Sequence, residues 1–197
     1  MNINETLKHY FGYDSLRPGQ QELIEGILQR KDVLGIMPTG AGKSLCYQVP
    51  ALMLDGITIV VSPLISLMTD QVKALNQAGV HAAYINSSLT ENQIRTALFY
   101  AAQGRYKIIY VAPERLNTIR FLEFACQVDI SMVTVDEAHC ISQWGQDFRP
   151  SYVGIADFLA QLPKRPVVSA FTATATERVK QDIMKSLRLQ NPVTVVT

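Results

Sequence analysis

The chain has 197 residues, and its 18 Lys and Arg residues nearly balance its 17 Asp and Glu residues. The net charge of +1 excludes binding of polyanions by bulk positive charge, although a local basic groove remains compatible with it. A hydrophobic content of 48% indicates a packed core and excludes general disorder. No signal peptide or membrane span is recognised, and the three cysteines lack the spacing of a disulfide framework or zinc site, so we expect a protein of the reducing cytoplasm with no membrane partner.

Short runs rich in Val and Ile alternate with helical patterns along the chain. The predicted strands are residues 32–37, 57–61, 81–85, 108–111, 132–135, 167–171 and 193–196. The predicted helices are residues 18–29, 43–54, 64–77, 90–103, 115–125, 152–162 and 177–187. Uniformly apolar strands that alternate with helices predict an α/β fold with a mostly parallel central sheet and helices on both faces. Ligands of such sheets bind beyond the carboxyl ends of the strands.

The first strand is followed by MPTGAGKS at residues 37–44 and then by a helix. In such a phosphate loop, backbone N–H groups close around a polyanion and the helix N-terminus adds positive partial charge. We expect Lys43 to reach the β and γ phosphates of ATP and the Ser44 hydroxyl to bind Mg²⁺. The loop residues assigned to the nucleotide site are Thr39, Gly40, Ala41 and Gly42. One departure is Met37, which stands where the general pattern has glycine, and the competing interpretation is a flexible turn with a surface lysine.

The fifth strand ends in Asp136 and Glu137, followed by Ala138 and His139. A hydrophobic strand that ends in aspartate is typical of a second Mg²⁺ ligand, so Asp136 is assigned to the metal. Glu137 is expected to orient or deprotonate the attacking water. Alone, these acids could form a solvated strand end; together with the phosphate loop they favour an NTPase. Two interpretations of His139 remain open: it shapes the loop by hydrogen bonding, or it relays a proton.

Taken together, TGAGKS and DEAH resemble the motifs of superfamily 2 helicases. The segments FGYDSLRPGQ (residues 11–20) and CISQWGQDFRP (140–150) resemble the adenine-recognition motif and aromatic-rich loop of RecQ-family DNA helicases. SPLISLM (62–68), APERL (112–116) and FTATA (171–175) match further motifs of that family, in its order. The resemblance implies a RecA-like motor domain that uses ATP and Mg²⁺. In the full-length protein it implies translocation on single-stranded DNA and 3′ to 5′ unwinding, with roles in repair and recombination.

The same resemblance implies a domain plan. Residues 1–197 correspond to a first RecA-like domain, with N-terminal helices and the adenine motif in residues 1–30 and the P-loop core in residues 31–197. The second RecA-like domain, the zinc-binding region and the winged helix of the family are not recognised in the sequence. The second motor domain supplies an arginine finger worth roughly 10³ to 10⁵ in rate. We therefore expect this chain alone to hydrolyse ATP poorly and not to unwind duplex DNA.

Three residues of the adenine motif are assigned to the nucleotide. A glutamine amide can pair with both the acceptor N7 and the donor N6 of adenine, which is the role expected of Gln20. Tyr13 could stack on the purine, and Arg17 could hold the motif or the ribose-phosphate edge. The alternative is that Tyr13 and Phe11 are ordinary core aromatics.

The aromatic-rich loop contains Trp144, the only tryptophan, with Phe148 and Arg149 nearby. An aromatic ring and a guanidinium in one loop suit single-stranded DNA, or a duplex with a single-stranded tail, because bases stack and phosphates pair with arginine. Since the loop leaves the acidic site directly, strand binding there could reposition Glu137. The alternative is a buried tryptophan that packs the loop down. Gln146 stands where several family members have His, which puts an acid–base role at that position in doubt.

Four further residues end strands and are assigned to DNA binding or coupling. Ser62 and Ser66 could hold a phosphate of the DNA backbone, or could simply cap the following helix. The resemblance implies that Thr172 and Thr174 link the nucleotide site to strand movement. Two rival functions remain: a non-catalytic, ATP-gated nucleic-acid-binding module, and a different P-loop phosphotransferase. Gln20 and Trp144 speak against the latter, because a phosphotransferase needs neither.

Overall fold

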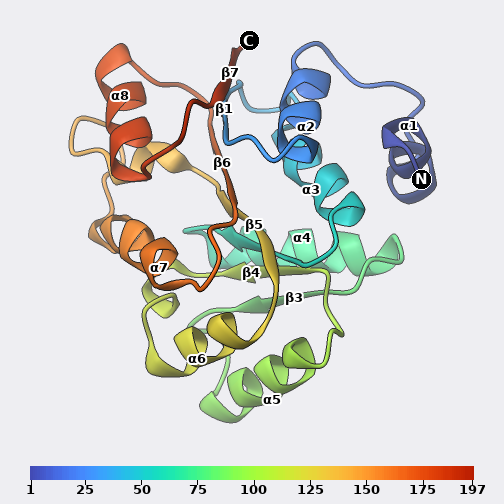
Figure 1. Cartoon of the computed structure of the whole chain (residues 1–197), viewed down its shortest axis with the longest axis vertical. Coiled ribbons are helices and arrows are strands. Elements are labelled where there is room, and N and C mark those ends of the chain that lie inside the picture. Colours follow the sequence, from blue (N-terminus) through green and yellow to red (C-terminus); the bar gives the residue numbers. More distant parts are fainter.

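The computed structural model describes residues 1–197 and contains one seven-stranded sheet in the order β3-β4-β2-β5-β6-β1-β7. All neighbouring strands are parallel. The strands are β1 (Val33–Ile36), β2 (Ile57–Val61), β3 (Ala82–Ile85), β4 (Ile108–Val111), β5 (Ile130–Val135), β6 (Val167–Thr172) and β7 (Val193–Val196). The expected mostly parallel sheet is confirmed, and its C-terminal strand lies at the edge beside β1 (Figure 1).

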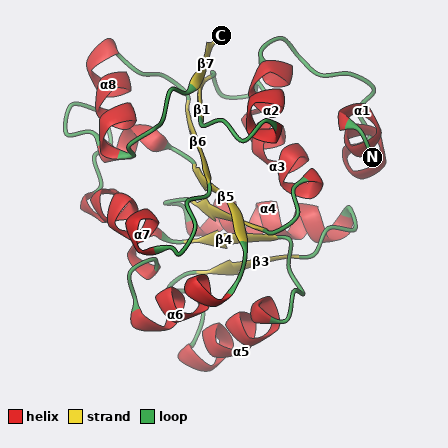
Figure 2. Cartoon of the chain, in the orientation of Figure 1, coloured by secondary structure: helices red, strands yellow, loops and turns green.

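The helices cover both faces of this sheet, as Figure 2 shows. They are α1 (Ile3–Thr6), α2 (Gln20–Leu28), α3 (Lys43–Met53), α4 (Ile65–Gln77), α5 (Glu91–Ala102), α6 (Ile119–Gln127), α7 (Ile155–Gln161) and α8 (Glu177–Ser186). One buried cluster joins α5 to α8 with side chains such as Leu34 and Ile59, and a second joins α2, α3 and α4 with side chains such as Val33 and Val60. Successive strand residues point to opposite faces, so one apolar strand supplies both cores.

Two predicted helices differ from the observed ones in their bounds. The pattern at residues 115–125 becomes a 3₁₀ turn, Pro113–Arg115, and then α6, and the pattern at 152–162 becomes a 3₁₀ turn, Pro150–Gly154, and then α7. Each turn starts at a proline, which has no N–H to donate but fits a first helical position. The two regions meet in a hydrogen bond from Asn117 Nδ2 to the Gly154 carbonyl at 2.9 Å. None of the helices is both long and apolar enough to cross a bilayer.

Candidate nucleotide and nucleic-acid site

The phosphate loop connects β1 to α3, with Gly40 and Gly42 both in the left-handed region at φ +86° and +81°. These angles favour glycine because a side chain there is strained. Met37 lies at the start of the loop, buried in the core, and its N–H donates to the Thr172 carbonyl at 2.9 Å. Its departure from the general pattern thus has a physical reason, since the residue continues the strand and packs as a core side chain. Lys43 Nζ donates to the Met37 carbonyl at 3.2 Å, across the loop.

A cavity of about 680 Å³ opens at this loop, within the size range of small-molecule sites. Its lining includes ten of the eleven residues that the sequence assigns to ATP, Mg²⁺ and the attacking water: Tyr13, Arg17, Gln20, Thr39, Gly40, Gly42, Lys43, Ser44, Asp136 and Glu137. The eleventh, Ala41, is not part of the lining and packs against the core. The tertiary structure therefore brings three distant segments to one cavity.

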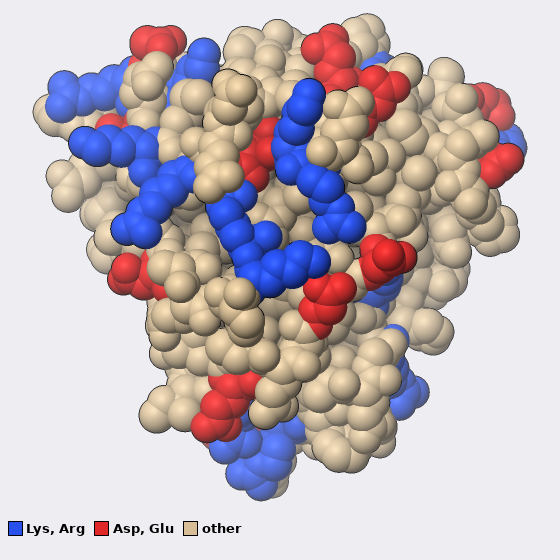
Figure 3. Space-filling model, viewed as in Figure 1, with Lys and Arg blue, Asp and Glu red and all other residues tan.

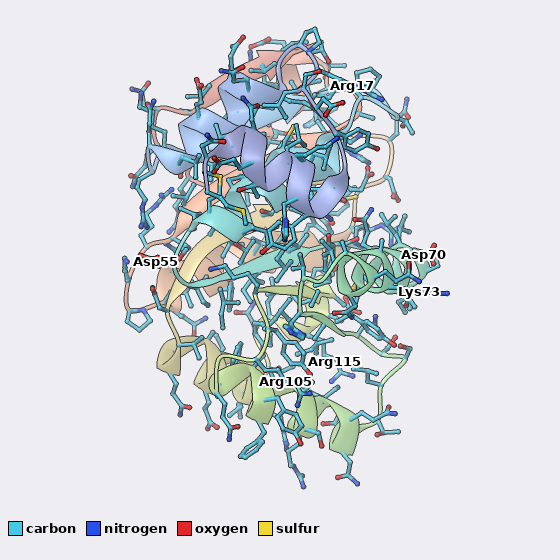
Figure 4. The ribbon with its side chains drawn as sticks, turned by 90° about the vertical axis from the view of Figure 1, so that its right-hand side faces the viewer. Arg17, Asp55, Asp70, Lys73, Arg105 and Arg115 are labelled. Carbon is cyan, nitrogen blue, oxygen red and sulfur yellow. The ribbon has the colours of Figure 1, made fainter.

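The adenine motif is held against the phosphate loop by hydrogen bonds. Gln20 is only 1% exposed; its Oε1 accepts from the Arg17 N–H at 2.7 Å and its Nε2 donates to the Gly42 carbonyl at 3.0 Å. Arg17 Nη1 in turn donates to the Gly40 carbonyl at 2.5 Å, and Figure 4 shows Arg17 on the segment ahead of α2. Each end of the Gln20 amide thus has one partner within the chain, and Oε1 and Nε2 each retain a second hydrogen-bonding position.

The two aromatic residues of this motif differ in their surroundings. Tyr13 is 53% exposed and lines the cavity, so the interpretation of Tyr13 as a core residue is wrong. Phe11 also lines this cavity, but it is partly buried and packs against two core clusters, which supports the core interpretation for that residue. The difference follows from position, because Phe11 ends a helical turn whereas Tyr13 lies after Gly12, whose φ of +76° turns the chain away.

The acidic pair follows β5, where the Asp136 N–H donates to the Val61 carbonyl at 2.9 Å. Burial raises the pKa of Asp136 to about 6, and the neighbouring carboxylate of Glu137 adds to this effect, while Lys43 opposes it. Glu137 has a φ of +51°, an unusual conformation for a residue with a side chain. Two crowded carboxylates together with the Ser44 hydroxyl form a set of hard oxygen donors, which suits Mg²⁺.

His139 connects the acidic pair to the end of β6. Its Nδ1 lies 2.8 Å from Thr172 Oγ1 and 3.4 Å from Glu137 Oε2. Thr172 Oγ1 also donates to the Thr174 carbonyl at 3.2 Å. Because β6 lies between β5 and β1 in the sheet, these contacts run beside the nucleotide cavity. The hydrogen-bonding interpretation of His139 is supported by this geometry.

The aromatic-rich loop presents Trp144 to the surface with 62% of the residue exposed, so the interpretation as a buried tryptophan is wrong. A groove of about 390 Å³ lies between this loop and the segment after β6, and its lining includes Trp144 and Thr174. Phe148 is partly buried. Arg149 pairs with Asp147, with Nη2 and Oδ2 3.2 Å apart.

The same loop brings His139, Cys140 and Asp147 within 4.8 Å of one another. Burial raises the pKa of Cys140 to about 12, so its side chain remains a thiol, and Asp147 is neutralised by Arg149. We interpret this cluster as hydrogen bonding that shapes the loop.

The two serines after β2 do not act as helix caps. Leu64 is the N-cap residue of α4, and no side chain caps that end. Ser62 is fully buried with no hydrogen-bond partner for its hydroxyl, whereas Ser66 is exposed in the first turn of α4. The capping interpretation is therefore wrong, and only Ser66 offers its hydroxyl to a ligand in this arrangement.

Several residues near the site were missed by sequence reasoning. Tyr152 is buried and donates from its hydroxyl to the Asp136 carbonyl at 2.8 Å. Ser142, Arg178 and Asp182 connect the aromatic-rich loop to α8. No local motif marks them, because their partners lie 16 to 40 residues away in the chain. Arg115, which belongs to the APERL segment, is not part of this site: it pairs with Glu91 at 3.4 Å, near α5 (Figure 4).

Comparison with known proteins identifies the class. A family model described as DEAD/DEAH box helicase matches residues 17–183. A hypothetical ATP-dependent RNA helicase from Sulfolobus tokodaii superposes with a TM-score of 0.75 at 22% identity, over 100% of this chain and 57% of that one. The DUF1998 helicase MrfA bound to DNA gives a TM-score of 0.72 at 16% identity, over 98% of this chain and 28% of that one. The chain belongs to the DEAD/DEAH box helicase family, and the two structural likenesses support its RecA-like fold.

Sequence relatives narrow the resemblance within this family. The ATP-dependent DNA helicase RecQ of Bacillus subtilis (strain 168) is 52% identical over 192 residues, covering 97% of this chain and 32% of that protein. The protein of the same name from Pasteurella multocida (strain Pm70) is 47% identical over 188 residues, covering 95% of this chain and 30% of that protein. The resemblance to RecQ helicases is thereby confirmed. The chain spans about a third of the length of these relatives.

Proposed function

We propose that this chain is the ATP-hydrolysing first motor domain of a RecQ-type DNA helicase. The observation that carries the proposal is the single cavity that joins Lys43 and Ser44 of the phosphate loop to Asp136 and Glu137. A nucleotide-dependent motor needs these groups around one phosphate chain. We assign the adenine motif to residues 1–30 and the P-loop core to residues 31–197. The three free thiols favour the reducing cytoplasm as its location.

The roles of the residues follow from their positions. Lys43 exchanges the Met37 carbonyl for the β and γ phosphates, while the N–H groups of the loop from Thr39 to Gly42 surround them. Ser44 and Asp136 hold Mg²⁺, which neutralises phosphate charge when it is bound. Glu137 orients the attacking water. Tyr13 stacks on the adenine from its exposed position at the cavity.

Recognition of the base by Gln20 uses the second hydrogen-bonding position at each end of its amide. Its Oε1 accepts from N6 of adenine in addition to the Arg17 N–H, and its Nε2 donates to N7 in addition to the Gly42 carbonyl. Because these two bonds also brace the phosphate loop, base binding and loop geometry are linked through one side chain. Arg17 keeps the motif attached to the loop through the Gly40 carbonyl.

Single-stranded DNA is the proposed partner, and its bases stack on Trp144 with support from Phe148. Arg149 and Ser66 contact phosphates. Although the chain is almost neutral, Lys and Arg gather over α8 and the adjoining middle of one face (Figure 3), which supplies the local basic surface that DNA requires.

The bound DNA strand and the nucleotide are coupled through the contacts beside the nucleotide cavity. Thr174 lines the groove next to Trp144, and Thr172 joins His139, which lies 3.4 Å from Glu137. Movement of the aromatic-rich loop thus reaches the residue that orients water. In the full-length protein we propose 3′ to 5′ translocation with a second RecA-like domain, whose arginine finger adds roughly 10³ to 10⁵ in rate.

The test is nucleotide binding measured by calorimetry with Mg²⁺ and ATP, followed by steady-state hydrolysis with and without single-stranded DNA. Lys43→Ala is the test variant, and Lys73→Ala, an exposed lysine on α4, is the matched control. We expect Lys43→Ala to lose most of the binding and Lys73→Ala to retain it. Equal binding by both variants would contradict the site. Binding without turnover, even with a second motor domain attached, would instead favour a non-catalytic ATP-gated module.

A further inference from the structure

The exposed Trp144 ring is not free in this structure. The Arg178 guanidinium lies over the indole, with its Cζ 3.7 Å from the ring centroid. At this distance a cation is attracted to the electron-rich face of an aromatic ring. Arg178 belongs to the first turn of α8 and is itself exposed, so one face of the ring is covered by a side chain that can move away without disturbing the core.

A second contact holds the backbone of the same loop against α8. Ser142 Oγ donates to Asp182 Oδ2 at 2.6 Å and accepts from the Trp144 N–H at 3.1 Å. Asp182 lies four residues after Arg178, which is one helical turn, so both side chains project from the same side of α8. The loop is therefore attached to α8 at its backbone and at its ring.

We propose that Arg178 is a positioning residue that holds Trp144 closed against α8 and competes with a nucleic-acid base for the ring. This inference rests on the proposed function of Trp144 as a stacking platform. An exposed cation–π contact is weaker than a base–aromatic stack, so an incoming strand can displace the guanidinium, and the contact can reform when the strand leaves. Single-stranded DNA thus opens a closed loop.

Because α8 lies beside the groove, displacement of Arg178 also affects the groove. The helix follows the segment 172–176, in which Thr172 bonds to His139 and Thr174 lines the groove beside Trp144. Release of the ring from Arg178 frees the Trp144 side chain, which lines this groove, while Asp182 continues to hold the loop at Ser142. When no DNA is bound, α8 therefore holds the groove in its closed arrangement, next to the contacts that lead to Glu137.

Because Trp144 is the only tryptophan, its fluorescence reports this contact directly in the full chain. The test variant is Arg178→Gln, and Lys180→Gln on the same helix is the control with an identical change of charge. Emission and acrylamide quenching are measured first without DNA. We expect Arg178→Gln to change the emission and increase the quenching, Lys180→Gln to match the wild type, and Arg178→Lys to restore part of the protection. An unchanged signal in Arg178→Gln would overturn the contact.

Titration with a poly-dT oligonucleotide then tests the competition. Arg178→Gln should bind about two- to five-fold more tightly than the wild type, the factor expected for loss of an exposed cation–π competitor. Lys180→Gln should bind equally or slightly less tightly, since it only removes charge. Weaker binding by Arg178→Gln than by Lys180→Gln would overturn the competition and make Arg178 a DNA contact. Absence of any DNA binding by the wild type would instead refute the proposed function, and the competition with it.

Discussion

Two aspartates at opposite ends of the sheet show how differently this protein treats a carboxylate. Asp32 precedes β1, is 2% exposed, and accepts four hydrogen bonds: two from Arg165 at 3.0 and 2.6 Å, one from the Val168 N–H at 3.0 Å and one from the Gln190 N–H at 2.7 Å. Asp136 follows β5, and its carboxylate accepts one bond, from the Glu137 N–H at 2.9 Å. The pKa of Asp136 is raised to about 6 by burial and by Glu137.

The difference separates stability from ligand binding. A buried charge is costly unless it is paired and fully hydrogen-bonded. At Asp32 the chain meets this requirement itself and joins the starts of β1 and β6 to the segment before β7. At Asp136 the chain leaves the charge poorly compensated at the nucleotide cavity, where a bound cation would compensate it. The chain thus compensates the charge of Asp32 by itself, whereas the proposed Mg²⁺ would compensate that of Asp136.

The largest expected effect comes from Asp32→Ala. This change leaves Arg165 and two backbone N–H groups without their partner, so the free energy of unfolding should fall by about 3–5 kcal/mol. Urea denaturation measures it. The control is Asp129→Ala, which removes an exposed pair with Lys164 at 3.8 Å and should cost at most about 1 kcal/mol. Similar losses in both variants would contradict the structural role of Asp32.

Asp136→Asn should reduce ATP hydrolysis without reducing stability. Hydrolysis of ATP should fall by about 100-fold or more, because a metal ligand supports several kcal/mol of transition-state stabilisation. The free energy of unfolding should remain equal or rise, since the change removes a poorly compensated charge. Turnover is measured in a chain that carries a second motor domain, and unfolding in the 197-residue chain. A strongly destabilised Asp136→Asn would show that the two aspartates do not differ in the proposed way.

Addition of Mg²⁺ and ATP should distinguish Asp136→Asn from the control Asp129→Ala. Mg²⁺ and ATP at about 100 times the dissociation constant should stabilise the wild type by about 2.7 kcal/mol. For a chain of this size, this corresponds to an increase in Tm of roughly 5–10 °C. Asp136→Asn should lose most of this increase, whereas Asp129→Ala should retain it. Calorimetric scans check the prediction, and an equal shift in Asp136→Asn would remove Asp136 from the metal site.

A smaller effect is expected at Trp144. Trp144→Ala should weaken binding of single-stranded DNA by about 1–3 kcal/mol, the value of one base–aromatic stack. Stability should change little, because the ring lies at the surface. Fluorescence anisotropy of a labelled oligonucleotide measures the affinity, and Phe99→Ala, another exposed aromatic on α5, is the matched control. If both variants bind DNA alike, the stacking role is wrong.

Local sequence was sufficient to predict most of the fold. The continuous apolar runs correspond to the seven strands, because the five inner strands are buried on both faces, and only the edge strands β3 and β7 are partly exposed. The segment MPTGAGKS specifies its own loop, since Gly40 and Gly42 adopt left-handed conformations and Lys43 begins α3. The errors in the bounds of α6 and α7 arise at Pro113 and Pro150, where short 3₁₀ turns replace the start of the expected helices.

Only the tertiary structure decided which side chains meet. Asp32 and Arg165 are 133 residues apart in the chain, and no local pattern links Trp144 to Arg178. The burial of Ser62 and the engagement of both ends of the Gln20 amide likewise depend on neighbouring elements. Backbone conformation and hydrophobic periodicity are set over a few residues, whereas the partner of a polar side chain depends on how distant elements pack. The sequence therefore determined the sheet, the loop and the acidic pair, and the packing determined which of their charges are compensated.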